Sequence, residues 1–307
     1  MNPSKTNPHP PALPPAAHRR GGFTLVELMS ATFVGLMLIA MFVAAFTQQR
    51  RVYRKEQLIT EMQQNARFAM ETISRDIRMA GYGLDVPEHQ LNTWVSWLPN
   101  FHQNPMISSG SGSDSDVLTI VAAFDEPVAA LSSGAPSGSQ TLSVSMLRGN
   151  FGDTFKPSDL IFIGKSETLR IEDVNSGQLV VSSHPTSSRG IRHTYAAGTP
   201  VELVGTVEYE IVPGGAWGGD FPYLARIDSL TQYYWFRGGN HSYGRDGRQD
   251  LMVTAGYIEE MQFQRQSGGI EVSLRARTSQ PDAYYVHPTF KDPYRRMNLT
   301  SLVRPRN

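Results

Sequence analysis

Residues 23–46 read FTLVELMSATFVGLMLIAMFVAAF and contain a single ionisable side chain, Glu27. About 20 apolar or small residues are enough for a helix to cross a bilayer. A secretory signal peptide would have a shorter apolar run ending in a small-residue cleavage site, whereas this run continues into further helical sequence. The stretch therefore predicts a membrane-spanning helix that stays in the mature protein.

The sequence after this stretch predicts that the same helix continues. No proline occurs in residues 16–86, and Gly35 is the only glycine in residues 23–80. Within residues 47–80, apolar side chains recur at three- and four-residue steps, without the sustained heptads of a coiled coil. We predict one helix over residues 23–80, with a transmembrane half at 23–46 and an amphipathic half that packs on a following domain.

From residue 81 onward, glycine, serine and proline separate short runs rich in β-branched and aromatic residues, which indicates strands joined by turns. Asn175-Ser176-Gly177 has the composition of a tight hairpin turn. No second long helical pattern follows, so we predict an α+β fold in which the long helix packs on a mainly antiparallel β head at residues 81–307. The predicted strands are 117–124, 141–147, 160–164, 169–174, 179–182, 200–211, 229–237, 257–265, 270–278 and 297–303.

Composition argues against several functional classes. The 28 basic and 28 acidic residues balance, and residues 81–307 carry a formal charge of −5, unlike the basic surface that nucleic-acid binding favours. The chain has no cysteine, so it has no disulfide, thiolate zinc site or cysteine nucleophile. The common catalytic, phosphate-binding and dinucleotide-binding motifs are also missing from the sequence. We expect no enzyme activity, no cofactor and no nucleic-acid partner.

Two loops contain oxygen-bearing side chains that could be taken for metal ligands. Asn240, Asp246 and Asp250 lack the regular spacing of an EF-hand, and Asp114 and Asp116 fit a solvated turn better. The aromatic run at 233–236 is better explained as a partly buried strand than as a base-stacking surface. We expect no metal site, and surface or turn positions for His184, His193, His241 and His287.

The residues that lead into the apolar stretch read Arg19-Arg20-Gly21-Gly22-Phe23-Thr24-Leu25-Val26-Glu27-Leu28. In its order of basic residues, glycine, phenylalanine and the run to Glu27, this segment resembles the class III signal of type IV pilins and type II secretion pseudopilins. The resemblance implies that a prepilin peptidase removes a cytoplasmic leader, residues 1–22, by cutting between Gly22 and Phe23. It also implies that the new amino terminus of Phe23 is methylated, and that Glu27 pairs with such an amine to set the register of subunits in a filament.

Later parts of the chain are similar to PilW-type minor pilins, which prime the assembly of a type IV pilus or cap it. This similarity implies a pilin-like lollipop, anchored in the bacterial inner membrane by one span with a periplasmic head, and then located in the pilus (fimbrium) at its tip. The implied partners are other minor and major pilins, the prepilin peptidase, the inner-membrane assembly platform and the lipid bilayer. Cell adhesion and twitching motility are the implied processes. The segments that carry the similarity are 113–120, 155–164, 257–263 and 294–307.

Two other functions stay open at this point. A pseudopilin at the tip of a type II secretion filament would have the same signal and the same helix. A membrane-anchored binding protein would keep an uncleaved helix and an intact Met1.

Overall fold

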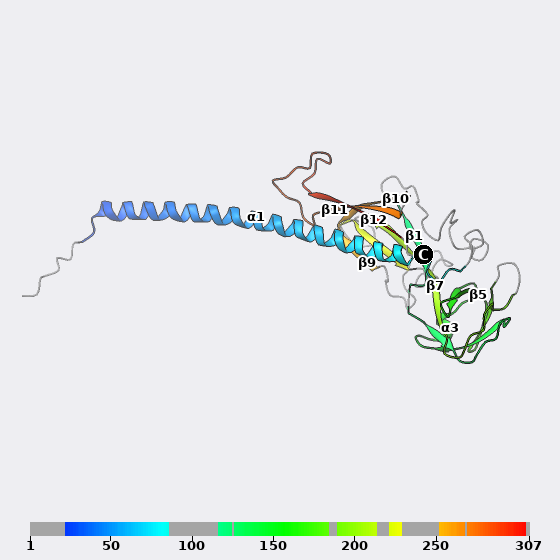
Figure 1. The fold of residues 1–307 in the computed structure, drawn as a ribbon. Coiled ribbons are helices and arrows are strands. Elements are labelled where there is room, and N and C mark those ends of the chain that lie inside the picture. The colour runs from blue at the N-terminus through cyan, green and yellow to red at the C-terminus, as the bar shows by residue number, and fades with distance from the viewer. Residues whose placement is uncertain are drawn as a thin grey trace, which may run out of the picture. The chain divides into compact units, whose positions relative to one another are not determined.

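The computed structural model of the 307-residue chain describes residues 22–85, 116–124, 126–183, 189–213, 221–228, 252–267 and 269–304, with the side chains of 252–254 left out. The chain divides into two compact units, residues 1–54 and residues 55–307. Helix α1 runs through the end of the first unit and the start of the second. All described β-strands belong to the second unit (Figure 1).

Helix α1 spans Leu25–Met79, which confirms the prediction of one long uninterrupted helix at the amino-terminal side. Its apolar first part, within residues 1–54, is exposed along its whole length, and this is the one helix of the described residues that is long and apolar enough to cross a membrane. The helix ends ahead of Gly81 and Gly83, which adopt positive φ angles of 78° and 84°. At Gly83 an added Cβ would lie 2.9 Å from the Ala123 Cβ, so both space and backbone angle call for glycine there.

The described strands of residues 55–307 form two antiparallel sheets. The larger sheet has nine strands, and the smaller one has the order β10-β11-β12. The strands of the larger sheet are β1 (Leu118–Ala122), β2 (Ala129–Leu131), β3 (Thr141–Met146), β4 (Leu160–Ile163), β5 (Glu167–Asn175), β6 (Gln178–Ser182), β7 (Pro200–Val212), β8 (Tyr223–Asp228) and β9 (Met252–Gly256). The smaller sheet consists of β10 (Ile258–Gln266), β11 (Gly269–Arg277) and β12 (Arg296–Val303).

Six strands of the larger sheet close into a barrel. The pairing runs β2-β3-β6-β5-β4-β7, and β2 pairs again with β7, so the ladder returns to its start. The interior is filled by apolar side chains of these strands, together with Phe155, which follows the short helix α3 (Phe151–Thr154). The long strand β7 also leaves the barrel, because its residues 205–212 pair with β1 and β8 instead of with β2 and β4.

A second core lies where α1 packs on the sheets. One face of α1 is buried there, including Met62, Ala66, Met70, Ile73 and Ile77. These side chains share a cluster with residues of β1, β7, β8 and the three strands β10, β11 and β12. The amphipathic pattern of residues 47–80 therefore corresponds to burial from Met62 onward.

Nine of the ten predicted strands are confirmed to within a few residues, and the tenth, 229–237, lies outside the described residues. The turn at Asn175-Ser176-Gly177 is also confirmed, because Asn175 pairs with Gln178 across it and Gly177 has a φ of 75°. The sequence prediction missed strands β2, β8 and β9, the helix α3 and the closure of the barrel.

Candidate functional site

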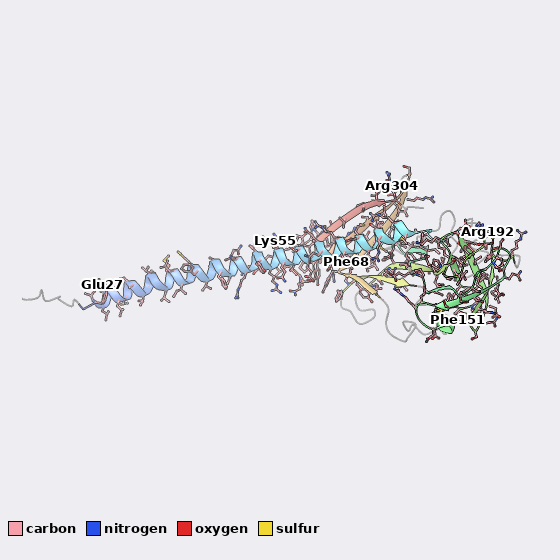
Figure 2. The ribbon with its side chains drawn as sticks, turned by 60° about the horizontal axis from the view of Figure 1, so that its bottom comes forward. Glu27, Lys55, Phe68, Phe151, Arg192 and Arg304 are labelled. Atoms are coloured by element: carbon pink, nitrogen blue, oxygen red, sulfur yellow. The ribbon has the colours of Figure 1, made fainter. Side chains whose placement is uncertain are left out.

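The beginning of α1 brings together the residues that the sequence singled out. The main-chain N–H of Glu27 donates to the Thr24 hydroxyl at 3.3 Å, and the Thr24 N–H donates to the Glu27 carboxylate at 3.5 Å. This reciprocal arrangement is a capping box, in which two side chains satisfy main-chain donors at a helix start. Figure 2 shows Glu27 in the first turn of the helix. Sequence reasoning assigned Glu27 a charge role and missed this local one, although the Thr-x-x-Glu spacing signals it.

Gly22 and Phe23 precede the helix and are exposed, with 85% of the Phe23 surface accessible. A Cβ added at Gly22 would meet no atom within 4 Å. The residues that the structure describes around this position therefore set no steric requirement for glycine at position 22. The main chain at the Gly22–Phe23 bond is not part of α1.

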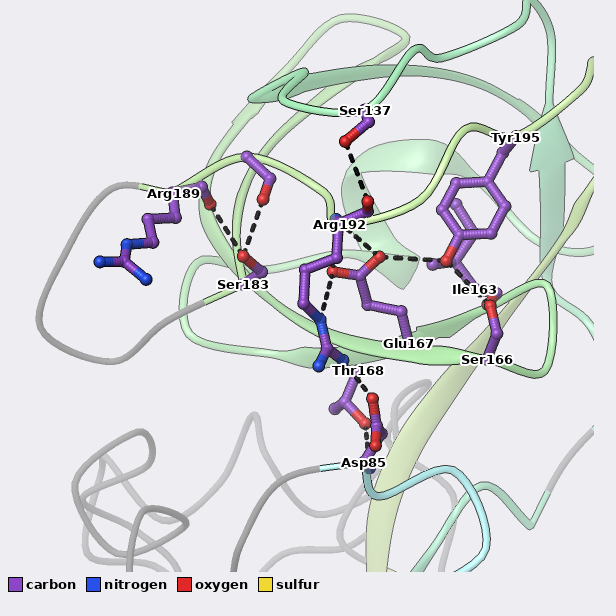
Figure 3. Close-up of polar contacts among 11 residues, drawn as sticks. Asp85, Ser137, Ile163, Ser166, Glu167, Thr168, Ser183, Arg189, Arg192 and Tyr195 are labelled. Carbon is purple, nitrogen blue, oxygen red and sulfur yellow. Dashed lines mark hydrogen bonds and ion pairs between the residues drawn. The ribbon is translucent and has the colours of Figure 1, made fainter.

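A buried carboxylate, Glu167 of strand β5, organises a polar network at one end of the barrel (Figure 3). It accepts hydrogen bonds from the Arg192 main-chain N–H at 2.8 and 3.0 Å, from the Arg192 Nε at 3.1 Å and from the Tyr195 hydroxyl at 3.0 Å. Burial raises the pKa of Tyr195 to about 12, with the charge of Glu167 adding to the rise and the hydrogen bond with Ser166 opposing it. Both oxygens of the Glu167 carboxylate therefore accept hydrogen bonds, which suits a role in stabilising the fold rather than in proton transfer.

The same network holds the segment that follows α1. The Thr168 hydroxyl donates to the Gly83 carbonyl and accepts from the Asp85 N–H, both at 2.7 Å. The Arg192 guanidinium also pairs with the Asp85 carboxylate. These contacts join the end of the helix to the barrel by hydrogen bonds at three points.

A second buried carboxylate, Asp76, lies on the packed face of α1 and is 2% exposed. It accepts hydrogen bonds from the Tyr209 hydroxyl at 2.7 Å and from the Arg226 Nε at 2.8 Å. Burial, reinforced by the charge of Asp76, raises the pKa of Tyr209 above its usual range. The three side chains come from α1, β7 and β8, so they fix the register of the helix on the sheet.

Metal and acid–base sites were not expected, and two of the doubtful residues have structural roles. Asp116 does not sit in a solvated turn as predicted, because its carboxylate accepts the Phe263 N–H of β10 at 2.9 Å. His287 Nδ1 accepts main-chain N–H groups of Thr289 and Phe290, which confirms its turn position. The described residues hold no cluster of three side chains able to bind a metal ion. Asp114, Asn240, Asp246, Asp250, His184, His241 and the aromatic run 233–236 lie outside the described residues.

A comparison with protein-family models gives no match for this chain, and comparisons with curated proteins and with solved structures also give none.

Proposed function

We propose that this chain is a prepilin: a minor pilin that primes or caps a type IV pilus after cleavage between Gly22 and Phe23 and methylation of Phe23. The observation that carries the proposal is the signal run at residues 19–28, placed directly at the start of a single apolar helix. The second half of that helix is the core element of an antiparallel β domain. The alternative of an ordinary membrane anchor explains the helix but gives no reason for the signal.

The main chain at the proposed cleavage site, the Gly22–Phe23 bond, is suited to a peptidase substrate. A protease needs an extended main chain, and residues 22 and 23 lie ahead of the first helical turn. Because no atom of the described residues lies within 4 Å of a Cβ added at position 22, a demand for glycine there would come from a partner such as the peptidase.

Glu27 supports a role in assembly. Within the described residues its carboxylate has Thr24 as its partner and forms no ion pair. A carboxylate in an apolar helix costs about 2.5 to 3.5 kcal/mol at the bilayer centre, and less near the interface. The methylated amine of a neighbouring Phe23 would supply the missing cation and would favour one stagger between subunits.

The remaining assignments follow from the same proposal. The leader lies in the cytoplasm and the β domain in the periplasm, with the apolar half of the helix, residues 23–46, in the inner membrane until the subunit enters the filament. Its partners are the prepilin peptidase, other minor and major pilins, the assembly platform and the bilayer, and it has no enzymatic activity. Removing residues 1–22 from the 307 leaves 285 residues, a bulky subunit better suited to a minor than to a repeating position.

Filament composition tests this function. An epitope-tagged chain should be recovered in sheared pili at low stoichiometry, and deleting the gene should reduce piliation. Loss of enzyme secretion with normal pili would instead place the chain in a type II secretion filament. Absence from both filaments, with neither phenotype, would contradict the proposal.

A further inference from the structure

Strand β12 forms an edge of the three-stranded sheet. It pairs with β11 on one side, and no described segment pairs with its other side. The Thr278 N–H donates to the Arg295 carbonyl at 2.9 Å, so that pair is hydrogen-bonded. Because hydrogen-bonded pairs alternate along antiparallel strands, the peptide groups of Asn298, Thr300 and Leu302 point away from β11. Each of these residues offers one donor and one acceptor at the open edge.

Between Arg296 and Arg304, this edge lacks the devices that usually block strand pairing. Proteins protect sheet edges with charged side chains, prolines, bulges or very short strands. Residues 297–303 read MNLTSLV, with no charge and no proline, and their register with β11 has no bulge. Leu302 is 47% exposed. An uncharged, unbroken edge of this length is a template for an added strand.

The edge is also held rigidly in place. On the inner face, Met297, Leu299 and Val303 pack against the core that contains α1. At the start of the strand, Arg296 forms two bidentate ion pairs, with Glu259 at 2.6 and 3.0 Å and with Asp292 at 2.6 Å for both contacts. A preorganised edge loses little conformational entropy when a partner strand binds.

At the other end of the strand lies a guanidinium group without a described carboxylate partner. Arg304 follows β12 directly, is exposed, and has no carboxylate partner among the described residues (Figure 2). A docking strand with an acidic residue near this end would gain an ion pair. An antiparallel pairing of two copies of β12 centred on Thr300 would instead place Arg304 opposite Arg296, whose guanidinium is already saturated. In this register Arg304 gains no carboxylate of its own, so a second copy of β12 offers a weaker contact than a strand with an unpaired carboxylate near this end.

We propose that the outer edge of β12 accepts an extended, uncharged segment of a different prepilin-type subunit, with a carboxylate of that segment near Arg304. This inference rests on the proposed function and specifies how the chain recognises its neighbour. The added strand extends the sheet β10-β11-β12 to four strands, and main-chain hydrogen bonds supply most of the contact.

Hydrogen exchange on the purified full chain in detergent tests whether the edge is open. The amides of Asn298, Thr300 and Leu302 should exchange faster than those of Leu299 and Ser301, which face β11. Equal and strong protection of both sets would overturn the proposal, because the edge would then be covered within the chain itself.

Paired substitutions at position 300 test the partner in cells that assemble the filament. Thr300→Lys places a charge at the edge, whereas the control Thr300→Val is uncharged, and both remove the contact between the Thr300 and Ser273 hydroxyls. We expect Thr300→Lys to lower incorporation into filaments at least tenfold, and Thr300→Val to leave it near the wild-type level. Equal incorporation of the two variants, with equal melting temperatures, would contradict docking at the β12 edge.

A photo-crosslinking amino acid at position 300 identifies the occupant, with the same group at the exposed Leu147 as the control. The expected product joins position 300 to an extended segment of another prepilin-type subunit, and Arg304→Glu reduces its yield. Products with a second copy of β12, or none beyond the Leu147 level, contradict the proposal. The amino terminus of each variant is sequenced in parallel. Normal cleavage before Phe23 without a crosslink would contradict docking at β12 and leave the proposed function standing. An uncut wild-type chain would contradict the proposed function itself.

Discussion

Glu27 combines a local contact with a charge, and different substitutions can separate the two. Its side chain closes the capping box with Thr24, and its charge is the only one in residues 23–46. Glutamine at this position of a capping box can still accept a main-chain N–H, so Glu27→Gln keeps the local contact and loses the charge. Alanine removes both.

We therefore predict that Glu27→Ala and Glu27→Gln are both cleaved nearly as well as the wild type but are both incorporated into filaments several-fold less efficiently. Immunoblots of membrane and sheared-filament fractions measure the two steps. Normal piliation in the Glu27→Gln strain would show that charge is not what sets the register.

Tyr195 should make the free energy of unfolding depend on pH in the alkaline range. Its pKa is raised from an ordinary 10.0 to about 12, so the native state keeps the hydroxyl proton over a range in which the unfolded chain loses it. The stabilisation is complete below pH 10 and disappears as the pH rises toward 12, a loss on the order of 2 kcal/mol. The free energy of unfolding of the full chain in detergent should fall between these pH values. The fall should be shallower in Tyr195→Phe, and an identical pH profile for that variant would contradict the assignment.

At the scale of elements, the docking of α1 on the sheets depends on a charge inside an apolar face. Asp76 lies three residues after Ile73 on the buried side of the helix and pairs with Arg226 and Tyr209. Removing one partner of a buried pair leaves an uncompensated charge, which costs about 3 to 5 kcal/mol.

Asp76→Ala should therefore lower the free energy of unfolding by about that amount, because the buried Arg226 guanidinium and the Tyr209 hydroxyl both lose this carboxylate. Glu71→Ala is the matched control, since Glu71 lies on the exposed face of the same helix and should change stability by less than about 0.5 kcal/mol. Denaturant titrations of the full chain in detergent measure both. Equal effects of the two substitutions would show that the Asp76 network does not anchor the helix.

The sequence predicted the elements that carry strong local patterns and missed those that depend on distant partners. The apolar run, the missing prolines and the amphipathic spacing identified α1, and β-branched runs identified nine strands. Strand β2 has three residues, Ala129–Leu131, too few for an alternating pattern. Its pairing with both β3 and β7, which closes the barrel, is a long-range contact without a local signal.

The polar networks were missed for a related reason. Asp76 interrupts the apolar face of a predicted helix, and such a charge indicates a buried partner, but the partner's identity depends on the packing of β7 and β8. Glu167 stands beside a predicted strand with no feature that separates it from a surface carboxylate. The amino-terminal residues Gly22, Phe23 and Glu27 came from a motif alone, and their roles stay predictions.

At the scale of the whole molecule, the two largest hydrophobic cores of the described residues in 55–307 share strand β7. The barrel lies in the chain between β1 and the second half of β7, and its interior has no residue in common with the core around α1. This arrangement is that of a barrel inserted into a helix-on-sheet domain.

Leu142→Ala, which empties space in the barrel interior, should destabilise the barrel by about 2 to 5 kcal/mol. We expect amide protection to fall in β3, β4 and β6 while the amides around Ile73 in α1 keep theirs. Hydrogen exchange with mass spectrometry resolves the two regions. A uniform loss of protection across both would show that they unfold as one cooperative unit.

Our central proposal is that the whole chain is a prepilin, cut and methylated before it joins a filament. Amino-terminal mass spectrometry of the protein, isolated from cells with and without the prepilin peptidase, tests it most directly. We predict a chain that begins with N-methylated Phe23 when the peptidase is present and retains residues 1–22 when it is absent. An intact or differently cut terminus in both strains would contradict the account and leave an ordinary membrane anchor.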